Sequence, residues 1–168
     1  SSLHQPAGAD GWAISHRTQL GKSMALASVR VHSDIPRTAT RLIGREREMR
    51  DLTTLLLEPS VRLITLTGPG GIGKTRLALE AAQAVHERFA SGVCYVPLAA
   101  IRDPDLVLPS IALQVGVREI TGLSLPDRLA SALRDWHVLL LLDNLEHLLP
   151  AATDLVWLLE RCPGIKVF

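Results

Sequence analysis

The chain alternates short apolar runs with longer stretches whose apolar residues recur every three or four positions. Apolar runs occupy residues 61–67, 92–98 and 138–142, and a fourth begins at residue 165. Continuous apolar runs of this length are typical of strands buried on both faces of a parallel sheet. The stretches between them have the period of amphipathic helices. The pattern predicts a three-layer α/β/α fold with a mainly parallel sheet.

Helix boundaries are indicated by residues that favour helix ends. We expect a first helix after a turn at Gly44 and a second that begins at Lys74. Asp103 and Ser124 precede two further helical stretches as candidate N-caps, and Gly116 ends the first of these. A last helix is predicted over residues 146–161, where Cys162, Pro163 and Gly164 follow and stop it.

The first 38 residues show no sustained period of either kind, and we predict a linker-like or loosely ordered segment over residues 1–38. Within it, residues 24–31 favour a short helix or strand with no visible partner. Residues 39–168 are predicted to form the folded domain. Because Phe168 falls inside an apolar run, we expect the domain to lack its C-terminal part and the chain to be a piece of a longer protein.

Composition narrows the class of protein. The 168 residues suit one domain, and a hydrophobic content of 47% is enough to form a core. A net charge of +1 gives no general attraction to nucleic acid or membranes. There is no apolar run of membrane-spanning length, no signal peptide, and no metal spacing between the two cysteines, so we expect a cytoplasmic location and no membrane contact.

The strongest motif follows the run 61–67 and has the pattern of a P-loop, a glycine, four residues and then Gly-Lys-Thr. The glycines would let backbone amides converge on phosphate oxygens. Lys74 would contact the β- and γ-phosphates, and the Thr75 hydroxyl would bind Mg²⁺. The predicted nucleotide-binding residues here are Gly68, Pro69, Gly70, Gly71, Ile72, Gly73, Lys74, Thr75 and Arg76.

A second motif lies at the end of the run 138–142, where five apolar residues precede Asp143. In open α/β sheets ligands bind at the carboxyl ends of the strands, so Asp143 is expected beside the phosphate loop. Together with the P-loop it is the expected Walker B acid, which binds Mg²⁺ jointly with Thr75. The alternative is a carboxylate that only caps a turn or helix.

Three segments together resemble the nucleotide-binding domain of the signal-transduction ATPases with numerous domains (STAND), which are related to the NB-ARC ATPases. They are residues 43–48 (IGRERE), 66–78 (LTGPGGIGKTRLA) and 140–149 (LLLDNLEHLL). The likeness is closest to the ATPase modules of large bacterial transcriptional regulators, some of which carry LuxR-type helix-turn-helix domains. It covers residues 40–168.

The resemblance implies ATP or ADP bound between the P-loop and the turn at Ile43, Gly44 and Arg45, with exchange or slow hydrolysis switching a larger protein. Relatives often have a second acid directly after the Walker B aspartate, where this chain has Asn144. An amide can orient water but cannot accept its proton. Glu146 is the nearest carboxylate that could act as the base, although its neighbours favour a helix start. An arginine that senses the γ-phosphate in the family would lie beyond Phe168, so weak ATPase activity is expected.

Three functions remain open from the sequence. The favoured one is a nucleotide-dependent switch whose partners are the sensor and output domains of the parent protein, with nucleotide-dependent self-association possible and no nucleic-acid contact by this segment. The second is an ordinary P-loop hydrolase or phosphotransferase, although no acceptor base or lid is visible. The third is a structural remnant that no longer binds nucleotide.

Overall fold

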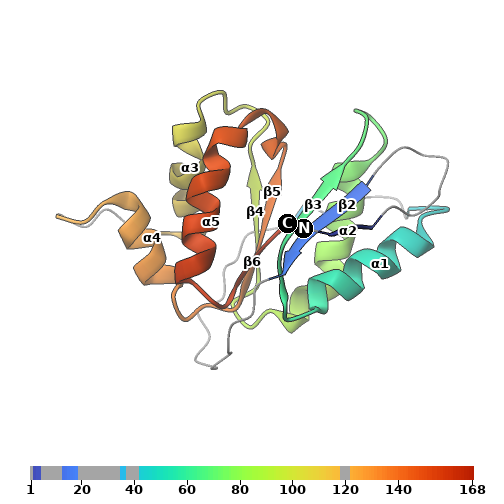
Figure 1. The fold of residues 1–168 in the computed structure, drawn as a ribbon, viewed down its shortest axis with the longest axis horizontal. Coiled ribbons are helices and arrows are strands. Elements are labelled where there is room, and N and C mark those ends of the chain that lie inside the picture. The colour runs from blue at the N-terminus through green and yellow to red at the C-terminus, as the bar shows by residue number, and fades with distance from the viewer. Residues whose placement is uncertain (1, 5–12, 19–34, 37–41, 118–121) are drawn as a thin grey trace.

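The computed structural model describes residues 2–4, 13–18, 35–36, 42–117 and 122–168, which form a six-stranded sheet flanked by helices (Figure 1). The strand order is β1-β2-β3-β6-β5-β4. The strands are β1 (Ser2–His4), β2 (Ala13–Thr18), β3 (Val61–Thr67), β4 (Val93–Pro97), β5 (Val138–Asp143) and β6 (Ile165–Val167).

Four of the strands, β3, β6, β5 and β4, are parallel to one another. β5 is paired with β4 over five positions, from Val93 opposite Leu139 to Pro97 opposite Asp143. β6 lies between β5 and β3 and pairs with both. All the carboxyl ends therefore meet at one edge of the sheet, and the predicted α/β fold with a mainly parallel sheet is confirmed.

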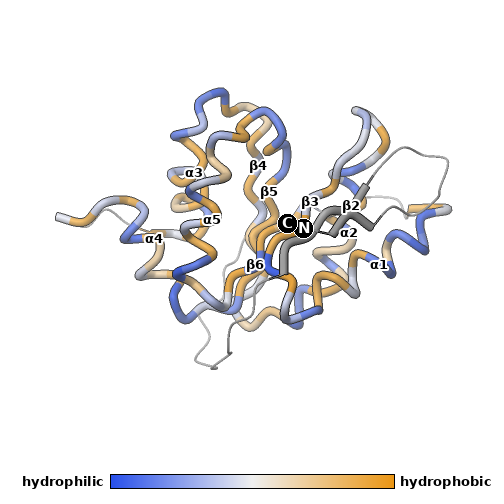
Figure 2. The backbone as a smooth tube through the Cα atoms, in the orientation of Figure 1, coloured by the Kyte–Doolittle hydropathy of each residue, from blue (hydrophilic) through white to orange (hydrophobic). Residues whose placement is uncertain are grey.

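Helices cover both faces of the parallel strands (Figure 1). The helices are α1 (Glu46–Leu57), α2 (Lys74–Val85), α3 (Val107–Val115), α4 (Leu125–Leu133) and α5 (Ala152–Arg161). One apolar core joins α1 and α2 to the sheet, and a second joins α3, α4 and α5 to its other face. β4 and β5 are apolar along most of their length, whereas the helices alternate apolar and polar positions (Figure 2). No helix in the described ranges is long and apolar enough to span a membrane.

The N-terminal strands differ from the prediction of a loosely ordered segment. β2 runs antiparallel to β3, from Ala13 opposite Thr67 to Thr18 opposite Val61, and β1 pairs with β2. Open edges of sheets present unpaired backbone groups, and β2 satisfies those of β3. Such pairing depends on the distant strand more than on local periodicity, so the sequence of β2 alone did not reveal it. The stretch 24–31 lies outside the described residues.

Most predicted helix ends are confirmed. The Ser124 hydroxyl accepts from the Asp127 backbone N–H, the Asp103 carboxylate accepts from that of Asp105, and Gly116 ends α3 with a φ of 72°. The helix predicted over 146–161 is wrong in its first part. Two 3₁₀ turns, Leu145–His147 and Leu149–Ala151, precede α5, because Pro150 supplies no backbone N–H and restricts the residue before it.

Two positively charged side chains of the sheet donate hydrogen bonds to backbone carbonyls at the C-terminal ends of helices, one on each face. The Lys166 ammonium on β6, 6% exposed, donates to the carbonyls of Leu56 (2.6 Å), Glu58 (2.8 Å) and Leu55 (3.4 Å) at the end of α1. Burial lowers the pKa of Lys166 to about 8. On β3, Arg62 donates to the carbonyl oxygens of residues at the end of α5 and just beyond it, namely Leu159, Cys162 and Ile165. The C-terminal ends of α1 and α5 are thereby attached to adjacent strands.

Candidate functional site

The glycine-rich loop connects β3 to α2 and leaves open space above its backbone. Gly71 and Gly73 have φ values of 81° and 88°, a region that favours glycine. A Cβ placed on Gly70, Gly71 or Gly73 would meet no atom within 4 Å. α2 begins at Lys74, and Gly73 before it has no side chain to cap the first turn. The first backbone N–H groups of α2 therefore have no side-chain cap, in the arrangement that binds anions.

Lys74 lies back over this loop. Its ammonium donates to the carbonyl oxygens of Gly68 (2.9 Å) and Pro69 (3.1 Å). These partners are neutral, and phosphate oxygens would be stronger acceptors for the same charge. The neighbouring Arg76, also predicted to bind nucleotide, pairs instead with Glu80 one turn along α2, at 3.6 Å.

Thr75 and Asp143 meet as predicted. The Thr75 hydroxyl donates to Asp143 Oδ1 at 2.8 Å. The contact follows from the pleat of β5: Leu139 and Leu141 point into the core formed with α2, and Asp143 is the next residue on that face. Thr75 belongs to the first turn of α2, which packs on the same face. The two predicted metal ligands are thus adjacent although 68 positions separate them in the sequence.

Tyr95 is a member of the site that sequence reasoning missed. Its hydroxyl donates to Asp143 Oδ2 at 3.1 Å, so both carboxylate oxygens are engaged by different elements. Burial, reinforced by the charge of Asp143, raises the pKa of Tyr95 to about 12. The phenol is therefore a protonated donor at neutral pH. No local pattern signals this contact, because it depends on the parallel pairing of β4 with β5, in which Tyr95 lies opposite Leu141, two residues before Asp143.

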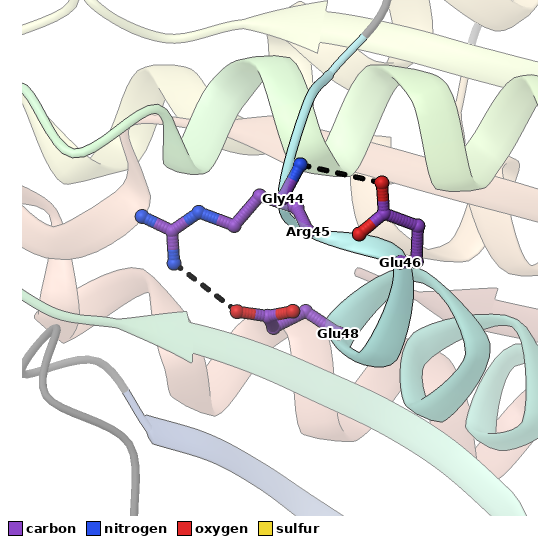
Figure 3. A network of polar contacts seen from close by, with 4 residues as sticks. All are labelled: Gly44, Arg45, Glu46 and Glu48. Carbon is purple, nitrogen blue, oxygen red and sulfur yellow. Dashed lines mark hydrogen bonds and ion pairs between the residues drawn. The ribbon is translucent and has the colours of Figure 1, made fainter.

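The turn before α1 holds a small polar network (Figure 3). Gly44 has a φ of 75°, and its backbone N–H donates to Glu46 Oε1 at 3.3 Å. The Arg45 guanidinium pairs with Glu48 Oε1, also at 3.3 Å. Both acids stand in the first turn of α1, where they complement the helix dipole. The turn predicted at Gly44 is therefore formed and held by its own side chains.

A small apolar pocket of about 20 Å³ lies between this turn and the phosphate loop. It is lined by Leu42, Arg45, Leu66, Ile72, Gly73, Lys74 and Leu77. The volume suits little more than one water molecule, so a nucleobase would rest on its rim or widen it. Ile43, predicted to contact nucleotide, is 90% exposed, and neither it nor Gly44 is among the residues that line the pocket.

The two residues considered for activating water lie just beyond β5. Asn144 adopts the left-handed region with a φ of 66°, which its short polar side chain tolerates, and it precedes the first 3₁₀ turn. Glu146 is in that turn and is exposed to solvent. The only acid joined to Thr75 by a hydrogen bond among the described residues is therefore Asp143.

These residues fit a magnesium-bound nucleoside phosphate. The open space over the glycines and the N-terminus of α2 suit phosphate oxygens. The Lys74 ammonium has neutral carbonyl partners, which phosphate oxygens could replace as stronger acceptors. A hydroxyl and a carboxylate in contact are oxygen donors of the kind that Mg²⁺ prefers. Thr75 and Asp143 would hold the metal, which when bound would screen the charge of the phosphates.

Comparison with known families gives a match to a family described as "AAA domain", over residues 60–166. An uncharacterized protein of Mycobacterium tuberculosis is 38% identical over 140 residues, which cover 83% of this chain and 35% of that protein. The regulatory protein AfsR of Streptomyces coelicolor is 30% identical over 131 residues, which cover 67% of this chain and 13% of AfsR. A putative HTH-type transcriptional regulator of Mycobacterium tuberculosis is 42% identical over 107 residues, which cover 63% of this chain and 12% of that protein, and the predicted likeness to modules of transcriptional regulators is thereby confirmed.

Among solved structures, the chain is similar to the Aeropyrum pernix ORC2 protein, whose structure is described as ADPNP-ADP complexes. The TM-score is 0.53 at 24% identity, and the similarity covers 74% of this chain and 38% of ORC2. This likeness supports the fold. Because the similarity covers between 13% and 38% of these proteins' lengths, the chain corresponds to one part of each of them.

Proposed function

The chain belongs to the AAA domain family, and we propose that it is an ATP- or ADP-binding P-loop module that acts as a nucleotide-dependent switch in a larger regulatory protein. The observation that carries the proposal is the hydrogen bond between Thr75 and Asp143 beside the open phosphate loop. In a P-loop that had become a structural remnant, Asp143 would serve only to join Thr75 and Tyr95, and its charge would not affect nucleotide binding.

The switch role, rather than rapid turnover, is favoured by the residues after β5. Asn144 follows Asp143, and an amide cannot accept a proton from water. Glu146 is exposed in a 3₁₀ turn. We therefore expect slow or absent hydrolysis, with bound nucleotide setting the position of neighbouring domains. The assignment to the STAND class and a cytoplasmic location are parts of the same proposal. The three sequence segments support the first, and the similarity to a regulatory protein supports the second.

The test is calorimetric titration of the purified chain with ATP and with ADP, each with Mg²⁺ and with EDTA. Lys74→Ala is the control, since it removes the ammonium that faces the loop carbonyls. We expect binding by the wild-type chain and a loss of about 10- to 100-fold or more in the variant, because hydrogen bonds to charged groups contribute about 1.5–3 kcal/mol each. Unfolding curves establish that the variant remains folded.

Two results would contradict the proposal. A folded wild-type chain that binds neither nucleotide would favour the remnant alternative. Rapid steady-state release of phosphate by the wild-type chain would favour an ordinary hydrolase. Tight retention of ADP with negligible turnover supports the switch.

A further inference from the structure

We propose that Tyr95 is a positioning residue for the metal site, whose hydroxyl holds the Asp143 carboxylate in the orientation that binds Mg²⁺ with nucleotide. The inference rests on the proposed nucleotide-binding function and adds a residue that neither the P-loop nor the Walker B pattern contains. It starts from the two bonds that the carboxylate accepts, one from α2 and one from β4.

A carboxylate at the end of a strand has a broad torsional range about its terminal bond. In this structure the two oxygens are distinguished by their partners. Oδ1 accepts from Thr75 at 2.8 Å, and Oδ2 accepts from Tyr95 at 3.1 Å. Two donors on different oxygens fix the plane of the group. Oδ1 is left on the side of the phosphate loop, and Oδ2 is tied back to the sheet.

Strand pairing and core contacts fix the position of Tyr95. β4 and β5 are paired over five positions, and beyond Pro97 the Leu98 backbone N–H donates to the Asp143 carbonyl at 3.0 Å. The ring of Tyr95 is partly buried against the core that contains α1 and α2. A tyrosine side chain has two main torsions, so its hydroxyl is placed with little loss of conformational entropy.

The chemical nature of the donor also matters. A lysine or arginine at position 95 would neutralise Asp143 and compete with a metal ion for it. A phenol donates a hydrogen bond without adding charge, so the full charge of the carboxylate remains for Mg²⁺. Partners that orient metal-binding carboxylates typically change metal affinity by about 10- to 100-fold when removed.

The test uses Tyr95→Phe in the full chain, a change that keeps the ring and removes only the hydroxyl. ADP affinity is measured by calorimetry with Mg²⁺ and with EDTA. We expect the gain in affinity that Mg²⁺ gives to fall about tenfold, while metal-free affinity stays within about twofold. The control is Ser110→Ala, which deletes a hydroxyl bonded to the Leu106 carbonyl on the opposite side of the sheet and should leave both affinities unchanged.

A second arm separates positioning from a general structural effect. In an Asp143→Asn background, Tyr95→Phe should cause no further loss of the Mg²⁺-dependent gain, because Tyr95 acts through Asp143. Equal losses with and without Mg²⁺, or additive losses in the double variant, would overturn the inference. If the wild-type chain binds Mg²⁺·ADP and the Tyr95→Phe variant binds it equally well, the role of Tyr95 is refuted and the proposed nucleotide binding stands. A wild-type chain that binds no nucleotide refutes the underlying function as well.

Discussion

Gly70 and Gly73 are glycines for different reasons. Gly73 has a φ of 88°, whereas Gly70 is not among the glycines with positive φ, and neither has an atom within 4 Å of an added Cβ. A methyl group at position 73 therefore causes backbone strain without a clash, and one at position 70 fills space without strain.

We expect Gly73→Ala to lower the free energy of unfolding by about 1–2 kcal/mol, the cost of a left-handed conformation for alanine. Gly70→Ala should leave it within about 0.5 kcal/mol of wild type yet weaken ADP binding, because its methyl group would project into the space assigned to phosphate. Urea unfolding and calorimetry measure the two quantities. If Gly70→Ala bound ADP normally, the phosphate would not occupy that space.

Asp143→Asn tests the metal role at a single atom. The substitution keeps the shape of the side chain and its capacity to accept from Thr75, and it removes the charge. We expect the affinity for Mg²⁺·ADP to fall by about tenfold or more, and metal-free affinity to change little or rise, since a negative charge near the phosphates is lost. Calorimetry in Mg²⁺ and in EDTA checks this. An equal loss in both conditions would show that Asp143 is a structural cap.

Among individual residues, the sequence predicted those of the phosphate loop and Asp143 but not the whole site. Lys74, Thr75 and Asp143 are identifiable because their chemistry demands fixed residue types at fixed places relative to a strand. Tyr95 lies in an apolar strand and resembles a core residue. Its contact with Asp143 depends on the pairing of two strands more than 40 positions apart, which the local sequence does not encode.

At the scale of elements, Lys166 shows how a strand and a helix depend on each other. Its ammonium satisfies three carbonyls at the end of α1, and burial lowers its pKa from 10.5 to about 8. The folded chain thus releases this proton more readily than the unfolded chain. Stability should be independent of this group below pH 8 and should rise as pH increases from about 8 toward 10.5.

Lys166→Met is therefore expected to have two effects. At pH 7 the free energy of unfolding should fall by about 1–3 kcal/mol, because buried carbonyls lose their donor. The rise in the free energy of unfolding between pH 8 and 10.5 that comes from titration of Lys166 should disappear. The cleanest window is pH 8–9, since burial raises the pKa of Cys162 to about 11 from its ordinary 9.0, and this lowers stability only above pH 9. Urea unfolding of both proteins across this window gives the comparison. Parallel pH profiles would show that Lys166 titrates normally.

The pattern of apolar residues predicted where most elements lie, because strands and amphipathic helices differ in period. It did not predict the interruption before α5, where Pro150 changes the local geometry within an otherwise helical pattern. It also could not predict the strand order, in which β6 lies between β3 and β5. Neighbours in a sheet are chosen by packing across the whole domain, and periodicity carries no information about them.

In the whole molecule, β2 covers the edge of the sheet that β3 would otherwise expose. It pairs with β3 from Thr67 to Val61, the full length of that strand. Our prediction that residues 39–168 form the domain can therefore be tested. A chain that contains only these residues would lack β2 and would expose the edge of β3. Unpaired strand edges promote pairing between chains.

Deletion of residues 1–38 should increase self-association relative to the full chain, and sedimentation velocity over a range of concentrations measures this. Deletion of residues 1–12 is the comparison, because it removes β1, keeps β2 on β3 and exposes the edge of β2 in place of that of β3. It should self-associate less than the deletion of residues 1–38, because β3 stays paired. If both deletions sediment like the full chain, residues 39–168 form a self-sufficient domain and β2 is an accessory strand.

The anchoring of α1 at one end has a mechanical consequence. Lys166 holds the C-terminal carbonyls of this helix, while Arg45, at its N-terminus, lines the pocket beside the phosphate loop. The helix has 12 residues and is about 18 Å long. Under the proposed function, a nucleotide that displaced the turn at Arg45 would move α1 more at its N-terminal end than at its C-terminal end, where Lys166 binds it. The surface of α1 away from the sheet is where such a movement would reach a neighbouring domain of the larger protein.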